Sequence, residues 1–446
     1  MKDKFKSIFK YIICFIVIVI LLVVTMFMTV KYISRDKIEQ NLKESIETLK
    51  SDLEVKYNKN KDENSYLHVY ADEVCLSMIY CMDSENALKS IMEDKYYKTE
   101  KLNPSLQKAI ELKSYGNTEY MRYWHGSMIV IRPLLIFFNL QQIYILLAIV
   151  LVILMIILFE ILLKKKSYIL IFAITIGLIL ISVWYVPFCL EYIWIFLIMF
   201  ITTIVGIIVE SKKDGNKKLN LLMFVTGIMT CFLDFLTTET LTFLIPILCI
   251  FTIRYQGKRI NNVKDEIKQI LCWIILWGLG YSFMWIAKWV LASIVLNINA
   301  LDYVLDRAAK RLVTYDFAYT LQMGLKKNIE MLLLFNFIKE PALIITMLID
   351  MLVFMIFTIK KDKQNIEMGL IVLALGFIPI LRFIVLALHS RIHFFFTYRV
   401  LLATIISIII FMYINIDSEK LKKKVILRGR KNGKKHRSNN FDTCAK

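Results

Sequence analysis

The sequence predicts an all-α, polytopic membrane protein with about ten transmembrane helices and a large helical outer loop after the first span. The 446 residues are 58% hydrophobic and 21% charged, with a mean hydropathy of +0.59, whereas an average soluble domain is roughly 45–50% apolar and about 25% charged. Glycine and proline are scarce, at 14 and 6, and no segment alternates with the two-residue period of a strand. The composition excludes a soluble enzyme, a nucleic-acid-binding module and a disordered chain.

Apolar runs of the length that a hydrocarbon core of about 30 Å demands recur along the whole chain. The sixth run is short, and Thr237–Thr240 interrupt the fifth and sixth, so these two form a tight pair or one kinked segment. The predicted spans lie approximately at 9–30, 141–163, 168–187, 189–210, 220–236, 240–253, 270–295, 341–359, 369–388 and 400–416.

The formal net charge is +19, and the distribution of its basic residues predicts how these spans are oriented in the membrane. Basic residues gather in the short loops of one side, at Lys164–Lys166, Lys212–Lys218 and Arg254–Lys264, and in the tail after Lys420. The positive-inside rule places such loops in the cytoplasm, which predicts a multi-pass plasma-membrane protein with both termini cytoplasmic. The charge therefore sets topology and attracts anionic lipid headgroups at the tail, and no nucleic-acid partner is expected.

The first span follows a basic N-terminal region, and its roughly 20 apolar residues exceed the core of a signal peptide, so it stays as an anchor. We therefore expect four regions. They are the cytoplasmic N-terminus and first span (1–30), an outer helical loop with a membrane re-entry segment (31–140), the transmembrane bundle (141–416) and the basic cytoplasmic tail (417–446). Within the outer loop, Ile38, Leu42, Ile46 and Leu49 recur at helical spacing and predict a helix over 37–53.

Polar residues in or beside a membrane are costly, so they point to function. Most of them lie on the predicted outer side, in five clusters. These clusters are YADEVCL (Tyr70–Leu76), RYWHGSMIVIRPLL (Arg122–Leu135), PFCLEY (Pro187–Tyr192), DFLTTET (Asp234–Thr240) and HSRIHFFFTYR (His389–Arg399). Since short loops join them, we expect the clusters to converge on one outer cavity, lined by Tyr123, Trp124, Arg132, Glu191, Asp234, Glu239, His389 and Tyr398 among others.

Each cluster also has a simpler interpretation. Asp72 and Glu73 fit a solvated helix face equally well, and Tyr, Trp, Arg and His at a membrane edge are typical of an interfacial belt. His389 and His393 stand four residues apart, a spacing that two metal ligands on a helix can use. No third ligand follows by spacing, so no metal site is assigned and a divalent cation is left open. Arg391, on the outer side, needs an anionic partner from protein, lipid or substrate.

Three further groups have structural interpretations. Asp350 and Arg382 lie at similar depths in antiparallel spans, which predicts an intramembrane ion pair. Lys288 is expected to extend outward to the interface. The eight cysteines show no zinc-like pairs and are read as small apolar fillers.

Carboxylates suit general-base activation of a hydroxyl, and cations suit a phosphate leaving group. The outer clusters therefore indicate group transfer from a lipid-phosphate donor. At these residues the sequence resembles the C-type membrane glycosyltransferase superfamily, in which a helix of the first outer loop carries an acidic motif. The resemblance implies that Asp72 is the catalytic base, with Glu73 beside it. It implies a polyprenyl-phosphate sugar as donor, whose phosphate is held by Arg122, His125, Arg391, His393 and Arg399.

The chain also resembles a set of multi-pass bacterial membrane proteins that share RYWHGS, LDFLTTETLT and FFFTYR-like stretches. That likeness covers most of the chain and brings no established activity. Two alternatives to an enzyme stay open, a glycolipid transporter or flippase and a non-catalytic assembly protein of the cell envelope. The enzyme prediction depends on whether Asp72, His125, Asp234, Glu239, Arg391 and Arg399 line one cavity.

Overall fold

A computed structural model describes residues 2–57, 63–99, 105–312, 316–332 and 362–417. Within these ranges the chain is helical, with no strand, and an isolated bridge pairs Tyr96 with Thr118. The prediction of an all-α fold is confirmed for this part of the chain. The predicted span at 341–359, Asp350 within it, and the tail from residue 418 lie outside the described residues.

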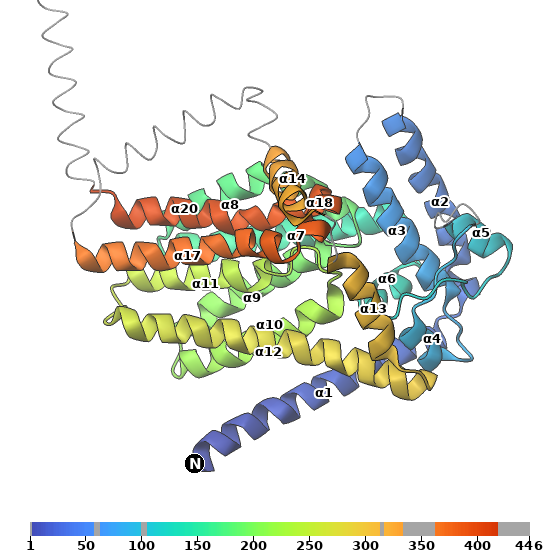
Figure 1. The fold of residues 1–446 in the computed structure, drawn as a ribbon, viewed down its shortest axis with the longest axis horizontal. Coiled ribbons are helices and arrows are strands. Elements are labelled where there is room, and N and C mark those ends of the chain that lie inside the picture. The colour runs from blue at the N-terminus through green and yellow to red at the C-terminus, as the bar shows by residue number, and fades with distance from the viewer. Residues whose placement is uncertain (1, 58–62, 100–104, 313–315, 333–361, 418–446) are drawn as a thin grey trace, which may run out of the picture.

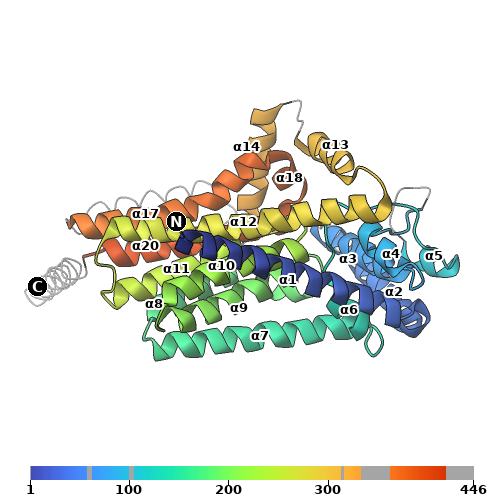
Figure 2. The ribbon, with the colours of Figure 1, turned by 90° about the horizontal axis from the view of Figure 1, so that it is seen from below.

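Six helices in the described ranges are long and apolar enough to cross a membrane, by length and composition. The chain is therefore a helical membrane protein. These helices are α1 (Lys2–Tyr32), α7 (Leu140–Lys164), α9 (Ile193–Glu210), α12 (Val263–Leu296), α17 (Lys363–Val385) and the run Phe394–Asn415, made of α19 (Phe394–Thr397), η2 (Tyr398–Val400) and α20 (Leu401–Asn415). Figure 2 shows α1, α7 and α12 running along the long axis of the bundle.

Three further helices pack among these six. They are α8 (Tyr168–Leu180), α10 (Gly215–Leu233) and α11 (Leu241–Gln256). The span predicted at 168–187 divides because α8 ends at Leu180 and Ser182 takes a left-handed conformation, after which η1 (Val183–Phe188) forms a tighter turn around Pro187. Proline removes a backbone donor, so the α-helix does not resume there.

Close packing of α10 on α12 depends on two glycines. A Cβ atom on Gly227 would lie 2.0 Å from the Trp277 carbonyl oxygen, and one on Gly280 would lie 2.2 Å from the Phe224 oxygen. Small residues of this kind let two membrane helices approach backbone to backbone. The contact fixes α12, whose far end reaches the site described below.

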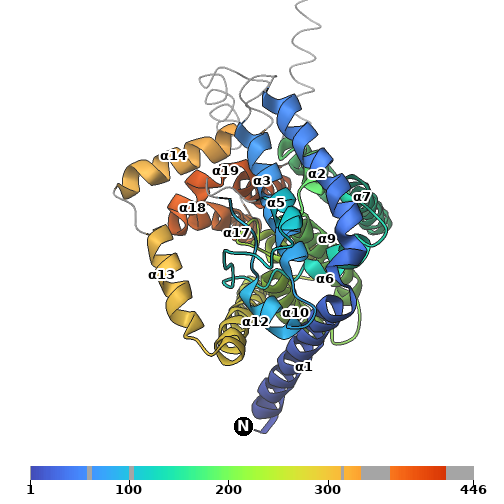
Figure 3. The same ribbon diagram turned by 90° about the vertical axis from the view of Figure 1, so that its right-hand side faces the viewer.

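One end of the bundle carries a cap of shorter helices (Figures 1 and 3). The cap consists of α2 (Arg35–Tyr57), α3 (Glu63–Cys81), α4 (Ala87–Glu93), α5 (Leu106–Glu111) and α6 (Met128–Leu134). The predicted helix over 37–53 is present as α2, and its Ile38, Leu42 and Leu49 are buried. Figure 3 shows α13 (Ala300–Leu312), α14 (Phe317–Glu330) and α18 (Ala387–Ile392) at the same end.

The opposite end, which we call the basic end, carries the turns that follow α7, α9 and α11. Lys166, Lys212 and Lys258 are exposed there. The bundle therefore has two chemically different ends, a basic one made of short turns and a capped one made of the shorter helices.

Candidate functional site

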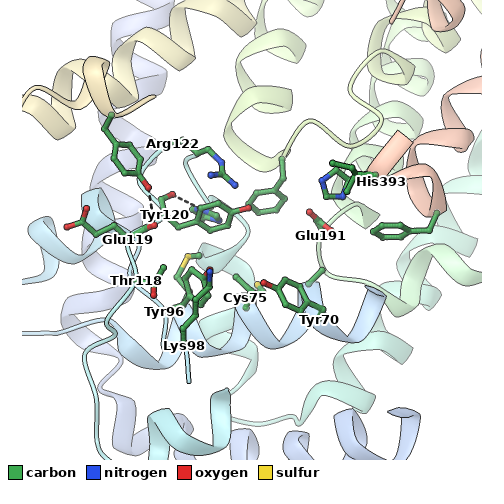
Figure 4. A pocket seen from close by; sticks show the side chains of 18 residues that line it. Tyr70, Cys75, Tyr96, Lys98, Thr118, Glu119, Tyr120, Arg122, Glu191 and His393 are labelled. Atoms are coloured by element: carbon green, nitrogen blue, oxygen red, sulfur yellow. Dashed lines mark hydrogen bonds between the residues drawn. The ribbon is translucent and has the colours of Figure 1, made fainter. Parts of the chain in front are cut away.

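A cavity of about 590 Å³ lies at the capped end of the bundle (Figure 4). One face of α3 forms its floor, because Tyr70, Val74, Cys75 and Met78 follow one another at helical spacing. The walls come from the loop between α4 and α6, the residues before α9, and side chains of α13, α18 and α19. Its aromatic lining residues are Tyr70, Tyr96, Tyr120, Phe235, Tyr303 and Phe395, and its ionisable ones include Lys98, Glu119, Arg122, His125, Glu191 and His393.

The acidic motif of α3 does not face this cavity. Asp72 is fully buried and accepts hydrogen bonds from the Tyr144 hydroxyl and from the Leu190 backbone N–H, the latter at 2.8 Å. Its carboxylate thereby joins α3 to α7 and to the segment before α9. Asp72, which was expected at the reaction centre, is not among the residues that line this cavity, because a helix residue two positions from Tyr70 points to a different face.

Glu73 also turns away from the cavity. Its Oε1 accepts the backbone N–H of Leu106 at 3.2 Å, at the start of α5. Burial raises the pKa of this carboxyl above its ordinary value, and the Leu106 N–H partly offsets that rise. Glu73 therefore holds the cap together instead of lining the cavity.

Arg122 presents a guanidinium group to the cavity. Its Cζ lies 4.2 Å from the centre of the Tyr120 ring and 5.1 Å from that of Tyr123, so cation–π contacts hold it. Its Nε is buried without a hydrogen-bond partner, and no ion pair joins it to an acid among the described residues. The two tyrosines hold Arg122 without an opposing carboxylate, so its charge is available for an anion.

His125 lies beside Arg122, with its backbone at a φ of 50°. The imidazole packs between Tyr120 and Phe235, with ring centres 4.8 and 4.9 Å away. Nε2 lies 3.2 Å from the Tyr120 carbonyl oxygen, which only accepts, so Nε2 carries the proton. Burial lowers the pKa of His125 well below its ordinary value, and the nearby charges of Lys288 and Arg122 lower it further. The ring is therefore neutral.

Two carboxylates line the cavity on opposite sides. Figure 4 shows Glu119 near Arg122 and Tyr120, and Glu191 across the cavity beside His393. Glu119 is exposed, whereas Glu191 is partly buried. Cys75 also lines the cavity, but burial first, and then the charges of Asp72 and Glu191, raise its pKa far above the ordinary value. The thiol is therefore protonated at neutral pH, and a protonated thiol is a poor nucleophile.

The DFLTTET cluster forms a turn behind the cavity. Asp234 accepts the backbone N–H groups of Leu236 and Thr237 at 2.9 and 3.0 Å. Glu239 forms a two-pronged ion pair with Arg382, with Nε–Oε1 at 2.6 Å and Nη2–Oε2 at 3.0 Å. Arg382 thus has Glu239 as its partner, where the sequence suggested Asp350. Asp234 and Glu239 were expected to line the cavity. Instead Asp234 accepts hydrogen bonds within this turn, and Glu239 forms the ion pair with Arg382.

A second buried ion pair lies behind the other wall. Lys288 of α12 and Asp94 after α4 are fully buried, and Nζ lies 2.6 Å from Oδ2. Lys288 therefore does not extend outward to solvent as expected. Burial raises the pKa of the Asp94 carboxyl to about 7, although Lys288 acts in the opposite direction. The pair joins the cap to the bundle close to Trp124, whose ring centre lies 5.5 Å from Nζ.

Arg391 and Arg399, two of the predicted phosphate-binding residues, do not line this cavity. Arg399 is buried against the rings of Tyr192 and Tyr398, and its Nη1 donates to the Phe395 carbonyl at 2.9 Å. Arg391 stacks on Tyr319, with Cζ 5.2 Å from the ring centre. Neither arginine is among the residues that line the cavity with Arg122.

Several predicted lining residues instead brace the walls. The Trp124 indole donates to the Met284 carbonyl at 2.8 Å, and the Tyr398 hydroxyl donates to that of Ile181 at 2.8 Å. Arg132 donates to the Ile33 carbonyl and ties α6 to the start of the cap. Tyr123 packs edge-on against His125, and His389 packs on His393 with ring centres 4.6 Å apart. Tyr123, Trp124, Arg132, His389 and Tyr398 were predicted to line the cavity but are not among its lining residues.

Four predicted site residues do meet at the cavity, namely Arg122, His125, Glu191 and His393. Sequence reasoning missed Tyr96, Lys98 and Tyr303, which line it from the cap and from α13. Tyr96 forms the isolated bridge with Thr118, and Lys98 follows two residues later. No short-range sequence pattern predicts this pairing. Of the six residues on which the enzyme prediction depended, only His125 lines the cavity, so those residues no longer support that prediction as a group.

No group of three or more His, Cys, Asp or Glu side chains in the described ranges is arranged to hold a metal ion. Comparison of the chain with family models, with curated proteins and with solved structures finds no match.

Proposed function

We propose that the protein is an integral membrane glycosyltransferase. In this proposal it transfers a sugar from a polyprenyl-phosphate donor to a cell-surface acceptor at the outer face. Ten spans, cytoplasmic termini and a capped end that faces outward belong to the same proposal. The separation of a basic end from a capped end supports it, because short basic loops are typical of the cytoplasmic side.

Arg122 is the observation that carries the proposal. Its guanidinium lies in a cavity of about 590 Å³, has no acid partner among the described residues, and rests on Tyr120 and Tyr123. A planar guanidinium binds phosphate oxygens through two parallel hydrogen bonds. Lys98 lines the same cavity and adds a second cation. Aromatic rings around these cations offer the apolar faces of sugar rings a surface to pack on.

Glu191 is the proposed general base, in place of Asp72. It lines the cavity and is less exposed than Glu119, whereas Asp72 is fully buried and already accepts two hydrogen bonds. Glu191 takes the proton of the acceptor hydroxyl as that oxygen bonds to the anomeric carbon of the sugar. The bond from that carbon to the phosphate oxygen breaks, and Arg122 and Lys98 stabilise the phosphate that leaves.

A binding role without chemistry is the second candidate. It is favoured by the use of Asp72 and Glu73 as hydrogen-bond acceptors for neighbouring segments. In that case the cavity holds a lipid-linked sugar for transport or for assembly with other envelope proteins, and no bond is broken.

To test the proposal, purified full-length protein in nanodiscs is incubated with radiolabelled polyprenyl-phosphate sugars and with a cell-envelope fraction that contains the acceptor. We expect label to move from the lipid to the acceptor, and Arg122→Gln to reduce the transfer about a hundredfold. A protein that binds the labelled lipid through Arg122 but releases no polyprenyl phosphate would support the binding role. Liposomes containing the same lipid would then measure its movement between leaflets, which only a transporter accelerates.

A further inference from the structure

A second hollow, which we call the apolar groove, lies at the basic end of the bundle. It has a volume of about 530 Å³ and opens between the start of α8 and the ends of α11 and α20. Ile169 and Phe172 form one wall, and Ile409 and Met412 form the other. The volume falls in the range of about 300–1,000 Å³ that is usual for small-molecule sites. The proposed transfer reaction makes no use of this groove.

One end of the groove is closed by a fixed chain of polar groups. The Ser167 hydroxyl donates to Gln256 Oε1 at 2.6 Å, and the Gln256 amide donates to the Tyr413 hydroxyl at 3.3 Å. The neighbouring Tyr255 donates to Asn365 Oδ1 at 2.9 Å. Tyrosines with an apolar body and a polar tip are typical of the boundary between hydrocarbon and headgroups. The groove is therefore apolar along its walls and polar at one end.

Two cations adjoin this polar end in the sequence, and their side chains have no partner among the described residues. Lys166 directly precedes Ser167, and Lys258 follows Gln256 by two residues. Both side chains are exposed, and neither makes an ion pair or hydrogen bond within the described ranges. Nearby Lys164 and Arg259 differ, because they pair with Glu160 and Glu210.

We infer that the apolar groove binds a phospholipid with an anionic headgroup. One acyl chain lies between α8 and α20, and the headgroup phosphate lies near Lys166 and Lys258. The groove is open on its outer side, since Phe172 is 56% and Tyr413 41% exposed. Apolar walls and these two cations together fit an anionic lipid better than a zwitterionic lipid or a soluble anion. Basic sites between helices on the cytoplasmic side of a membrane bind such headgroups, and the proposed topology puts the basic end on that side.

Native mass spectrometry of the detergent-purified full-length protein, titrated with phosphatidylglycerol or phosphatidylcholine, tests the inference. We expect one phosphatidylglycerol to bind in preference to phosphatidylcholine. Lys166→Gln and Lys258→Gln should each weaken that binding about fivefold, the effect of one basic residue at a membrane surface. Met412→Trp should abolish the bound species by filling the groove, whereas Ile153→Trp, at an exposed position of α7, should leave it unchanged.

The lysine variants change exposed side chains, so they keep the test valid if Met412→Trp does not fold. Equal binding of the two lipids would overturn the inference, because the cations would then play no part. Retention of phosphatidylglycerol by folded Met412→Trp would place the lipid elsewhere and would also contradict it. Failure of the unaltered protein to bind phosphatidylglycerol has the same consequence, and none of these results bears on sugar transfer at the other end.

Discussion

Arg122 and Arg382 lie at the same end of the bundle, yet their surroundings are opposite. Arg382 is held by both oxygens of Glu239 and by the carbonyl groups of Leu236 and Thr237. Arg122 has two aromatic faces and no acid partner among the described residues. The first arginine completes the fold, and the second is available for a ligand. Residue type alone does not distinguish these roles, whereas the partners do.

The carboxylates differ in burial and in position. Asp72, Asp94 and Glu239 are buried and each is engaged by the protein. Glu191 is partly buried and lines the cavity. Charged groups buried in the structure are therefore distinct from those that line the cavity. We expect substitutions in the first set to lower stability and substitutions in the second to lower sugar transfer.

The largest effect is expected at the engaged pair. Glu239→Ala leaves Arg382 buried without its counter-charge, which costs about 3–5 kcal/mol when one member of a buried ion pair is removed. Thermal unfolding in detergent measures this loss. The double variant Glu239→Leu, Arg382→Met is the control, and it should recover most of the stability because both members of the ion pair are then removed together. A single variant as stable as the unaltered protein would contradict the structural role.

Arg122→Gln should lower sugar transfer without lowering stability. We expect transfer to fall about a hundredfold, the usual cost of removing one group that stabilises a developing anion, with little change in the unfolding temperature. Arg391→Gln is the matched control, since Arg391 also stacks on a tyrosine but does not line the cavity. Equal losses of transfer in both variants would remove the distinction between them.

Asp94, the buried carboxyl group that pairs with Lys288, provides a smaller, pH-dependent test of the buried charged groups. Its pKa in the folded protein is about 7, above the ordinary value of 3.8. Between about pH 4 and pH 7 the folded state therefore holds a proton that the unfolded state has released, so this group's contribution to stability decreases as pH rises. Asp94→Asn cannot titrate. Unfolding temperatures across that range should fall for the unaltered protein relative to the variant, and parallel curves would contradict the assignment.

The smallest effect is expected for the aromatic support of Arg122. Tyr120→Leu removes the ring that lies 4.2 Å from the guanidinium. Cation–π contacts at partly exposed sites contribute about 0.5–1 kcal/mol, so donor affinity should fall by about two- to fivefold. Equilibrium binding of labelled donor measures this. Tyr120→Phe keeps the ring face and should bind like the unaltered protein, and an equal loss in both variants would point to the hydroxyl.

Much of the fold is predictable because apolar length and helical spacing are local properties of the chain. The helix over 37–53 and the apolar helices follow from them. The site is less predictable, because the direction of a side chain depends on rotation about its helix. Asp72 and Cys75 are three residues apart on α3, yet one is buried against Tyr144 and the other lines the cavity. Long-range partners such as Glu239 for Arg382, 143 positions apart, leave no local pattern.

Turnover per folded molecule, compared between Glu191→Gln and Asp72→Asn, tests the central claim most directly. Both variants replace a carboxylate by an amide of similar size, and circular dichroism with size-exclusion chromatography gives the folded fraction. We predict that Glu191→Gln binds labelled polyprenyl-phosphate sugar but does not transfer it. Asp72→Asn should yield less folded protein, with turnover per folded molecule retained. Transfer that survives in Glu191→Gln and disappears in well-folded Asp72→Asn would contradict the account.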